Sequence, residues 1–169
     1  MTMTMAQHIH HTLTAYLAHH PEEAAELAPA LRLAAAPETE PAEHFTVSTA
    51  LRVRGPRAEV LYLHHRAQAD WLLPGGHLDP ADPSLLAAAE RELAEETGIA
   101  GAVPAATLPV DFFRYTSRIT GRTAYHARFA HTVDARPACR LQESEVTAAR
   151  WVPLAELPDE RLRERLRAV

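Results

Sequence analysis

The sequence contains no lysine, and all 17 of its basic residues are arginine. Alanine and proline are also abundant, which favours a GC-rich genome as the reason; the alternative is an affinity for phosphate, which guanidinium groups bind well. With 22 aspartate and glutamate residues, the formal net charge is −5. Such an acidic chain is not typical of a general nucleic-acid binder, because that kind of binding depends on a basic surface.

Cysteine and long apolar runs are scarce as well. Cys139 is the single cysteine, which excludes an intramolecular disulfide framework and a cysteine-based zinc cluster. No stretch approaches the roughly 20 apolar residues of a membrane helix. The N-terminal residues lack the basic and apolar segments of a signal peptide. We therefore expect a cytoplasmic protein with no membrane partner.

The chain has the composition of a globular protein, with 169 residues of which 47% are hydrophobic and 23% are charged. That length allows one domain of ordinary size with a short extension. Apolar residues recur at helical spacing from residue 5, the pattern breaks at His19–Pro21, and a second helix is expected from Glu22 to Ala35. We therefore divide the chain into a helical N-terminal extension with its linker, residues 1–43, and a main domain, residues 44–169.

From residue 44 the spacing of the apolar residues changes to that of strands. We expect strands at 45–53 and 60–63, a long helix at 83–97, and a hairpin of strands near 106–116 and 123–133. Residues 151–153 form a short extended piece, and a last helix begins at Pro158. This order predicts an α/β fold in which a mixed sheet carries helices on both faces.

The helix at 83–97 is the most informative segment, because Glu92, Glu95 and Glu96 stand at positions i, i+3 and i+4. This spacing places three carboxylates on one face of the helix. They repel one another, and they lie near the helix C-terminus, where the macrodipole disfavours anions. Both effects favour a compensating cation, and hard oxygen ligands suit Mg²⁺ or Mn²⁺. The alternative is an ordinary solvated acidic face.

The residues that flank this helix support a built site. Asp82 suits the N-cap with Pro83 at the first helical position, and Gly98 suits the left-handed residue after the helix end. A turn at Gly75–Gly76 allows the backbone to approach the carboxylates and to offer a carbonyl oxygen. Arg91 can hold the carboxylate of Glu92 in one orientation.

This segment resembles the Nudix box, G-x5-E-x7-R-E-U-x-E-E-x-G-U, in which U is an aliphatic residue. Arg91 to Ile99 match the second half at every fixed position, and Gly76 matches the opening glycine. The middle departs from the pattern, because Asp82 replaces the first glutamate and eight rather than seven residues separate it from Arg91. In the family, that first glutamate usually contributes least to metal binding, so the departure bears little on activity.

The resemblance implies a Nudix-type α/β/α sandwich with a mixed sheet, over residues 44–160 or thereabouts. It also implies a metal-dependent pyrophosphohydrolase, in which water attacks one phosphorus of a nucleoside diphosphate derivative or nucleoside triphosphate and a phosphate-bearing group leaves. Mg²⁺ (or Mn²⁺) would be the cofactor. The implied metal ligands are the carboxylates of Glu92, Glu95 and Glu96 and the backbone carbonyl of Gly75, while Arg91 orients Glu92.

Further site residues are expected outside the box. Many family members carry another glutamate on a later loop, as a base or an extra ligand, and Glu143 and Glu145 both suit this role; a solvated acidic loop is the alternative. The candidate substrate-binding residues are His77, Arg114, Tyr115 and Tyr125. For the aromatic residues of the hairpin, core packing is the alternative to stacking on a base. The paired histidines at 64 and 65 are expected to be solvated or half-buried rather than metal ligands.

The resemblance leaves a second function open, because the same fold also serves as a nucleotide-sensing binding domain without turnover. The intact second half of the box favours the enzyme. Either function predicts a small-molecule nucleotide as the ligand. Two roles are open for the N-terminal helices: they cover the sheet, or they form a contact in a homodimer.

Overall fold

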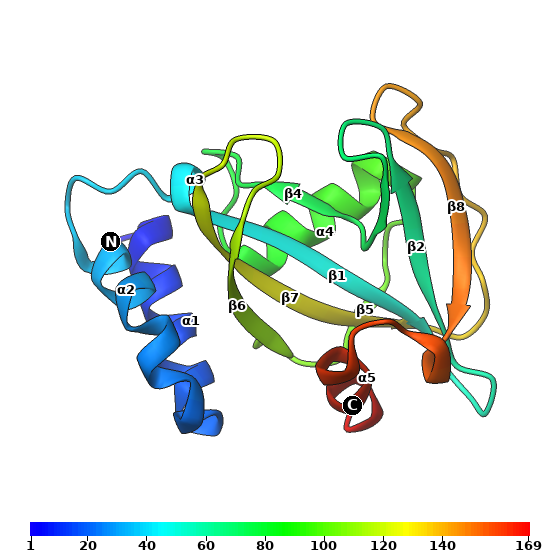
Figure 1. Ribbon diagram of the computed structural model, residues 1–169, viewed down its shortest axis with the longest axis horizontal. Coiled ribbons are helices and arrows are strands. Elements are labelled where there is room, and N and C mark those ends of the chain that lie inside the picture. Colours follow the sequence, from blue (N-terminus) through cyan, green and yellow to red (C-terminus); the bar gives the residue numbers. More distant parts are fainter.

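The computed structural model describes residues 1–169 and contains an eight-stranded mixed sheet with helices on both faces (Figure 1). The helices are α1 (Met5–His19), α2 (Ala24–Ala35), α3 (Pro41–His44), α4 (Leu85–Thr97) and α5 (Glu160–Arg167), with short 3-10 turns η1 (Pro21–Glu23) and η2 (Leu154–Glu156). The strands are β1 (Phe45–Val53), β2 (Glu59–His65), β3 (Asp70–Leu72), β4 (Gly75–His77), β5 (Val103–Pro104), β6 (Asp111–Thr116), β7 (Thr123–Val133) and β8 (Val146–Pro153).

Strand β1 is the centre of the sheet. One of its edges pairs in parallel with β7 along its whole length. The other edge pairs with two antiparallel strands in succession, since β4 joins the first half of β1 and β2 joins its end. β2 in turn pairs with β3 and β8, and β7 with β5 and β6. The edge of β1 is therefore shared between β4 and β2.

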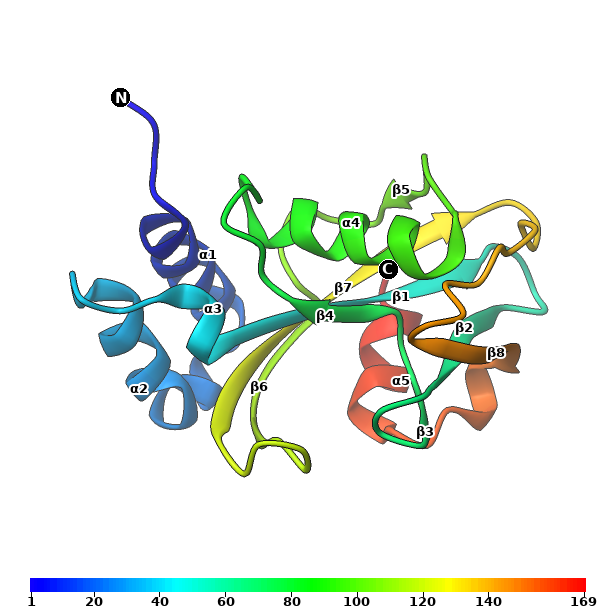
Figure 2. The ribbon, with the colours of Figure 1, turned by 90° about the horizontal axis from the view of Figure 1, so that it is seen from above.

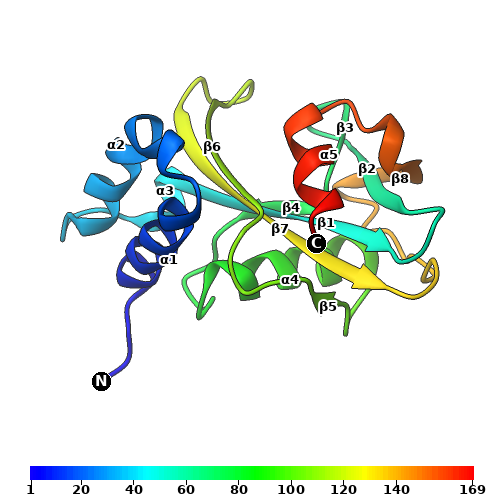
Figure 3. The same ribbon diagram turned by 90° about the horizontal axis from the view of Figure 1, so that it is seen from below.

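Helices α4 and α5 lie on opposite faces of the sheet (Figures 2 and 3). Successive side chains of a strand point to opposite faces, so β1 serves both helices. Val47 packs in the cluster that contains the first turns of α4, and Leu51 in the cluster that contains Leu93. Ala50 packs instead with Leu162 of α5. This two-sided burial explains why β1 carries a single charged residue, Arg52, near its end.

The N-terminal helices form a hairpin that packs on the same core. Ile9, Leu13, Tyr16 and Leu27 are at most 1% exposed and belong to one cluster with Leu85 of α4 and several sheet residues. The hairpin therefore covers one end of the sheet (Figure 1). No helix of the chain is both long enough and apolar enough to span a membrane.

The start of α4 differs from the sequence prediction. Ser84, not Asp82, is the N-cap: its backbone is extended and its hydroxyl accepts a hydrogen bond from the N–H of Ala87. Asp82 is free to act elsewhere because the extra residue in this segment lengthens the loop before the helix. At the other end the prediction is confirmed, since Gly98 adopts φ 73°.

Three further elements differ from expectation, of which one is the piece at 151–153, since strand β8 begins already at Val146. Gly75 and Gly76 form strand β4 rather than a turn, since their partner β1 satisfies their backbone groups. The expected strand at 106–116 begins only at Asp111, with the two-residue strand β5 before it. The strands expected at 45–53 and 123–133 are confirmed residue for residue.

Candidate active site

The predicted carboxylates lie on the face of α4 that meets β4. Glu92 and Glu96 are buried, at 9% and 1% exposure, whereas the Glu95 side chain is 48% exposed. The backbone N–H of Gly75 donates a hydrogen bond to Glu96 Oε1 over 2.8 Å. Strand β4 thus passes directly beside the last two turns of the helix and fixes one of the buried carboxylates.

Close approach is the reason for the two glycines of β4. A Cβ atom at Gly75 would lie 2.2 Å from the carbonyl oxygen of Val47 in β1. A Cβ at Gly76 would lie 2.7 Å from Oε1 of Glu92. Neither glycine has a positive φ. They are therefore required by packing against β1 and Glu92, and not by a turn conformation.

Arg91 holds this cluster in place through several contacts. Its Nη1 donates to Glu92 Oε1 and to Glu95 Oε2, each over 3.1 Å. Its Nε and Nη2 donate to the two oxygens of Asp82 over 2.8 and 3.0 Å, and Nη2 also donates to the His77 carbonyl. Arg91 thus ties the loop before α4 to two of its glutamates, and the bidentate pair with Asp82 gives the guanidinium a fixed orientation.

The electrostatics of the cluster disfavour the charged form of its two buried carboxylates. Burial raises the pKa of Glu96 to about 8, although the Gly75 N–H opposes this. The neighbouring carboxylates raise it further, namely those of Glu92, Glu145 and Glu95. Burial also raises the pKa of Glu92, against the opposing effect of Arg91. Carboxylates with raised pKa values in close proximity are a favourable place for a cation.

The structure separates the two candidate loop glutamates. Oxygen atoms of Glu145 and Glu96 and a ring nitrogen of His65 lie within 4.8 Å of one another. The backbone carbonyl of Glu143 accepts a hydrogen bond from Arg66, and its exposed side chain makes no hydrogen bond or ion pair. Glu145 is therefore the loop carboxylate that joins the site. It arrives there because β8 begins at the next residue and pairs with β2.

The candidate substrate-binding residues differ in exposure to solvent, and one of them is buried in the core. Arg114 and His77 are exposed, and the hydroxyl of Tyr115 lies 3.1 Å from Thr46 Oγ1 on the sheet. Tyr125 is 5% exposed and belongs to the core cluster, where its ring lies 6.1 Å from that of Phe45. For Tyr125 the core-packing alternative holds, because β7 turns this side chain toward the buried face.

The structure also forms a polar row across β1 and β7, which the sequence alone does not reveal. His126 Nδ1 lies 2.7 Å from Thr46 Oγ1, and its Nε2 lies 2.6 Å from Ser48 Oγ. Burial, assisted by Arg128, lowers the pKa of His126 to about 3. The alternation of β1 and β7 marks these residues as sharing a face, but only the parallel register of the two strands brings them together.

A comparison with protein families settles the assignment of the chain. The model of the NUDIX domain matches residues 43–169. The chain belongs to this family. This Nudix hydrolase is 32% identical over 116 residues to phosphatase NudJ of Escherichia coli K12, a match that covers 68% of this chain and 71% of NudJ.

Solved structures agree on the Nudix fold. Ap4A hydrolase of C. elegans, in a binary complex, superposes with a TM-score of 0.61 at 18% identity over 73% of this chain and 93% of the other. The NUDIX domain of Shewanella oneidensis NrtR, complexed with ADP ribose, superposes with a TM-score of 0.60 at 25% identity over 79% of this chain and 92% of the other. Helix α4 and strand β4 of this chain thus carry the Nudix-box residues within the fold of the family.

Proposed function

We propose that this Nudix hydrolase is a divalent-metal-dependent pyrophosphohydrolase that cleaves the diphosphate linkage of a nucleoside diphosphate derivative or nucleoside triphosphate. The observation that carries the proposal is the pair of buried carboxylates, Glu92 and Glu96, packed against β4 beside the exposed Glu95. Buried acids at this density are stable only with a proton or a cation, and a cation is also what phosphate oxygens require.

The donor set fits Mg²⁺ or Mn²⁺. All of its expected members are hard oxygen atoms, which these ions prefer. The ligands would be the carboxylates of Glu92, Glu95, Glu96 and Glu145, with the backbone carbonyl of Gly75. The raised pKa values of Glu92 and Glu96 support the fit, since burial and neighbouring carboxylates disfavour their charged forms and a bound cation would favour them.

The chemistry then divides between the ion and the chain. A bound divalent ion neutralises phosphate oxygens and lowers the pKa of a coordinated water. Arg91 positions Glu92 and Glu95, and Gly75 positions Glu96. The exposed Glu145 is the group best placed to accept a proton from the attacking water. The oxygen of that water bonds to one phosphorus, and the bridging P–O bond breaks as the phosphate-bearing group leaves.

A nucleotide is the substrate class that the relatives support. One similar structure holds ADP ribose, and another is named for hydrolysis of Ap4A. In this chain Arg114 and His77 are exposed for contact with such a ligand, and Tyr115 offers a half-buried ring on β6. A panel of dinucleotides, nucleotide sugars, ADP-ribose and nucleoside triphosphates, assayed for phosphate release with Mg²⁺, would identify the preferred member.

Substitution of the glutamates tests the proposal. Glu96→Gln and Glu95→Gln should each lower Mg²⁺-dependent turnover by about two orders of magnitude or more, because each removes an anionic ligand of the cation that acts on the reacting phosphate. Glu145→Gln should also lower turnover, and its matched control, Glu143→Gln, should remain near wild type. Thermal unfolding of metal-free Glu96→Gln should match or exceed wild type, since the change removes a buried acid whose charged form is disfavoured.

Near wild-type turnover of Glu95→Gln or Glu96→Gln would contradict the ligand assignment. If no compound of the panel is turned over and one binds tightly, the protein is a nucleotide-sensing domain on the Nudix fold instead of an enzyme of this type.

A further inference from the structure

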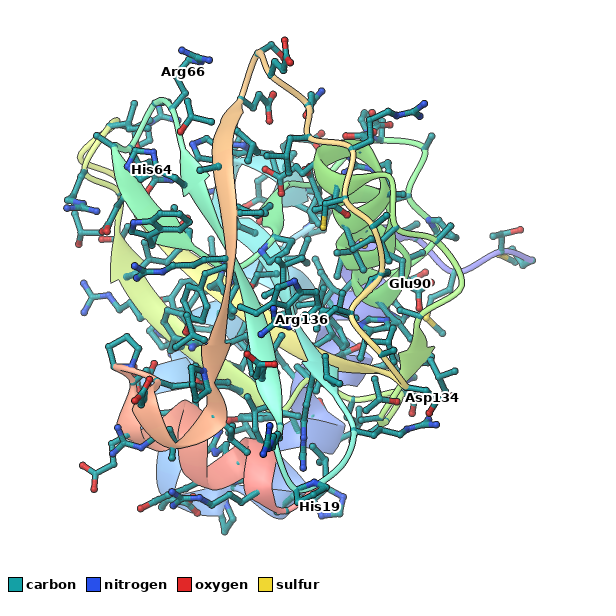
Figure 4. All side chains as sticks on the ribbon, turned by 90° about the vertical axis from the view of Figure 1, so that its right-hand side faces the viewer. His19, His64, Arg66, Glu90, Asp134 and Arg136 are labelled. Carbon is teal, nitrogen blue, oxygen red and sulfur yellow. The ribbon has the colours of Figure 1, made fainter.

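We propose that His65 supplies a nitrogen ligand to the divalent cation held by Glu96 and Glu145, so that this site has a mixed nitrogen and oxygen donor set. The inference rests on the proposed metal-dependent function. His65 lies outside the Nudix box, at the end of β2. Figure 4 labels its neighbours in the chain, His64 within β2 and Arg66 just beyond it.

The distances suit one shared ion. His65 Nε2 lies 3.8 Å from Glu96 Oε2, which is too long for a hydrogen bond. A ring nitrogen of His65 and carboxylate oxygens of Glu96 and Glu145 all lie within 4.8 Å of one another. Two ligand atoms that each lie about 2.1 Å from one ion are roughly 3 to 4 Å apart. The 3.8 Å between His65 Nε2 and Glu96 Oε2 is therefore within the range expected for two ligands of one ion.

The fold aims His65 at α4 and its neighbour away from it. Leu61 and Leu63 of β2 pack in the cluster with Leu93 of α4, and His65 continues that face by strand alternation. His64 points to the other side, where its ring meets Trp71 at 5.2 Å and its Nδ1 lies 2.8 Å from Thr147 Oγ1. A register shift between β2 and β8 at these two residues sets His65 opposite Val146, the residue after Glu145.

The imidazole of His65 has no hydrogen-bond partner in the protein. Neither of its ring nitrogens makes a hydrogen bond, and Nδ1 is fully buried. The ring is only 21% exposed, so unmet polar atoms are costly there. Coordination through Nε2 satisfies one nitrogen. Coordination through Nε2 would leave the ring proton on the buried Nδ1.

Gln142 belongs to the same locality by its backbone. Its N–H donates to the carbonyl of Glu96 over 3.0 Å, and its own carbonyl accepts from the N–H groups of Glu145 and Val146. The backbone of Gln142 thus joins the loop that carries Glu145 to the end of α4.

A second cluster of possible metal ligands contains a carboxylate whose charge is already balanced by arginines. His20, Glu22 and Glu23 also bring ligand atoms together. Glu23, however, accepts from Arg161 and Arg165 at 2.8 and 2.7 Å and from the hydroxyl of Tyr16. That carboxylate already has its cations. The side chains of Glu96 and Glu145 have no arginine partner, because Arg91 contacts Asp82, Glu92 and Glu95.

A nitrogen ligand changes which ions the site prefers. Imidazole suits transition metals, whereas Mg²⁺ binds almost only oxygen. We therefore expect Mn²⁺ to bind more tightly than Mg²⁺, and this preference to depend on His65. Glutamine in place of histidine keeps a polar side chain of similar reach but removes the nitrogen donor.

The test uses the full chain with Mn²⁺ as the probe. Pulsed electron paramagnetic resonance should show nitrogen hyperfine coupling to bound Mn²⁺ in the wild type and in the control His64→Gln, and no coupling in His65→Gln. Calorimetric titration should show Mn²⁺ binding weakened by about tenfold or more in His65→Gln, with Mg²⁺ binding changed much less. Thermal unfolding of the metal-free variants checks that both remain folded.

The outcomes separate this inference from the proposed function. If wild-type Mn²⁺ shows no nitrogen coupling, or shows the same coupling in His65→Gln, the assignment of His65 is wrong even if nucleotides are hydrolysed. If the coupling is present and depends on His65 while no nucleotide of the panel is hydrolysed, His65 is a ligand and the proposed reaction is wrong.

Discussion

Single residues in this protein acquire their roles from partners distant in the sequence. Asp82 is an example: as the residue nearest to the start of a helix it suits an N-cap, yet it binds Arg91 through both oxygens. Hydrogen bonds from that guanidinium lower its pKa against the effect of burial. His126 is another example, because it sits between two hydroxyls of a strand 80 residues away. These contacts set the pKa values of Asp82 and His126, and such pKa values can be tested through the pH dependence of stability.

The neutral state of His126 predicts a loss of stability in acid. Its folded-state pKa of about 3 lies below the ordinary value of 6.5, so below pH 6.5 the unfolded chain takes up a proton that the folded chain does not. Stability is therefore complete above pH 6.5 and declines as the pH falls toward 3. Between pH 7.5 and 5, urea unfolding should show wild type losing about 2 kcal/mol more than His126→Gln. Equal losses in the two proteins would contradict the neutral histidine.

At the scale of elements, strand β4 positions the carboxylates of α4, because it contacts both Glu92 and Glu96. It is three residues long, and it lies between β1 on one side and the carboxylates of α4 on the other. Its two glycines face different neighbours. Gly75 meets backbone of β1, which cannot move without loss of strand pairing, and Gly76 meets the flexible end of Glu92. A methyl group should therefore lower the stability of the fold at Gly75 and disturb the position of Glu92 at Gly76.

Alanine substitutions in β4 test this difference. Gly75→Ala should destabilise the protein by about 2 kcal/mol or more, because its Cβ would overlap the Val47 carbonyl. Gly76→Ala should keep its free energy of unfolding within about 1 kcal/mol of wild type but weaken Mn²⁺ binding and turnover, because Glu92 must rotate away. Denaturant unfolding and calorimetric titration measure the two effects. Wild-type stability of Gly75→Ala, or wild-type metal affinity of Gly76→Ala, would show that the packing is not as tight as described.

At the scale of the whole molecule, the N-terminal hairpin and the catalytic domain share one core. Leu13 and Tyr16 pack in the cluster that holds Phe129 of β7. Arg165 of α5 binds Glu23 and the Tyr16 hydroxyl, so the hairpin is also joined to the far end of the chain by charge. Covering the sheet is therefore one role of these helices, and a homodimer contact stays a prediction.

Shared burial predicts a single unfolding transition. Leu13→Ala should lower the free energy of unfolding of the entire protein by about 2–5 kcal/mol, the usual cost of emptying a buried leucine site. Its control, Thr14→Ala on the exposed side of the same helix, should remain within about 0.5 kcal/mol of wild type. Circular dichroism and tryptophan fluorescence should report the same midpoint, since the tryptophans lie far from the hairpin in sequence. A separate early transition of the helices would contradict the shared core.

Much of the fold and part of the site can be predicted from the sequence, because they depend on local patterns. Apolar spacing locates β1, β7 and α4, and the i, i+3, i+4 spacing places Glu92, Glu95 and Glu96 on one helix face. The flanks of α4 are predicted only in part, since Gly98 ends it as expected while Ser84 begins it. A cap can be assigned from sequence only if no stronger distant partner competes for the side chain, and Arg91 competes for Asp82.

The family, the order of most elements and the acidic helix face therefore follow from the amino-acid sequence, because each is written in residues close together in the chain. Three other outcomes required the folded chain: which strand lies beside that face, which loop glutamate joins it, and which of two adjacent histidines turns toward it. They depend on the register of β2 with β8 and of β4 with β1. Register is set by the packing of whole strands, and no local pattern records it.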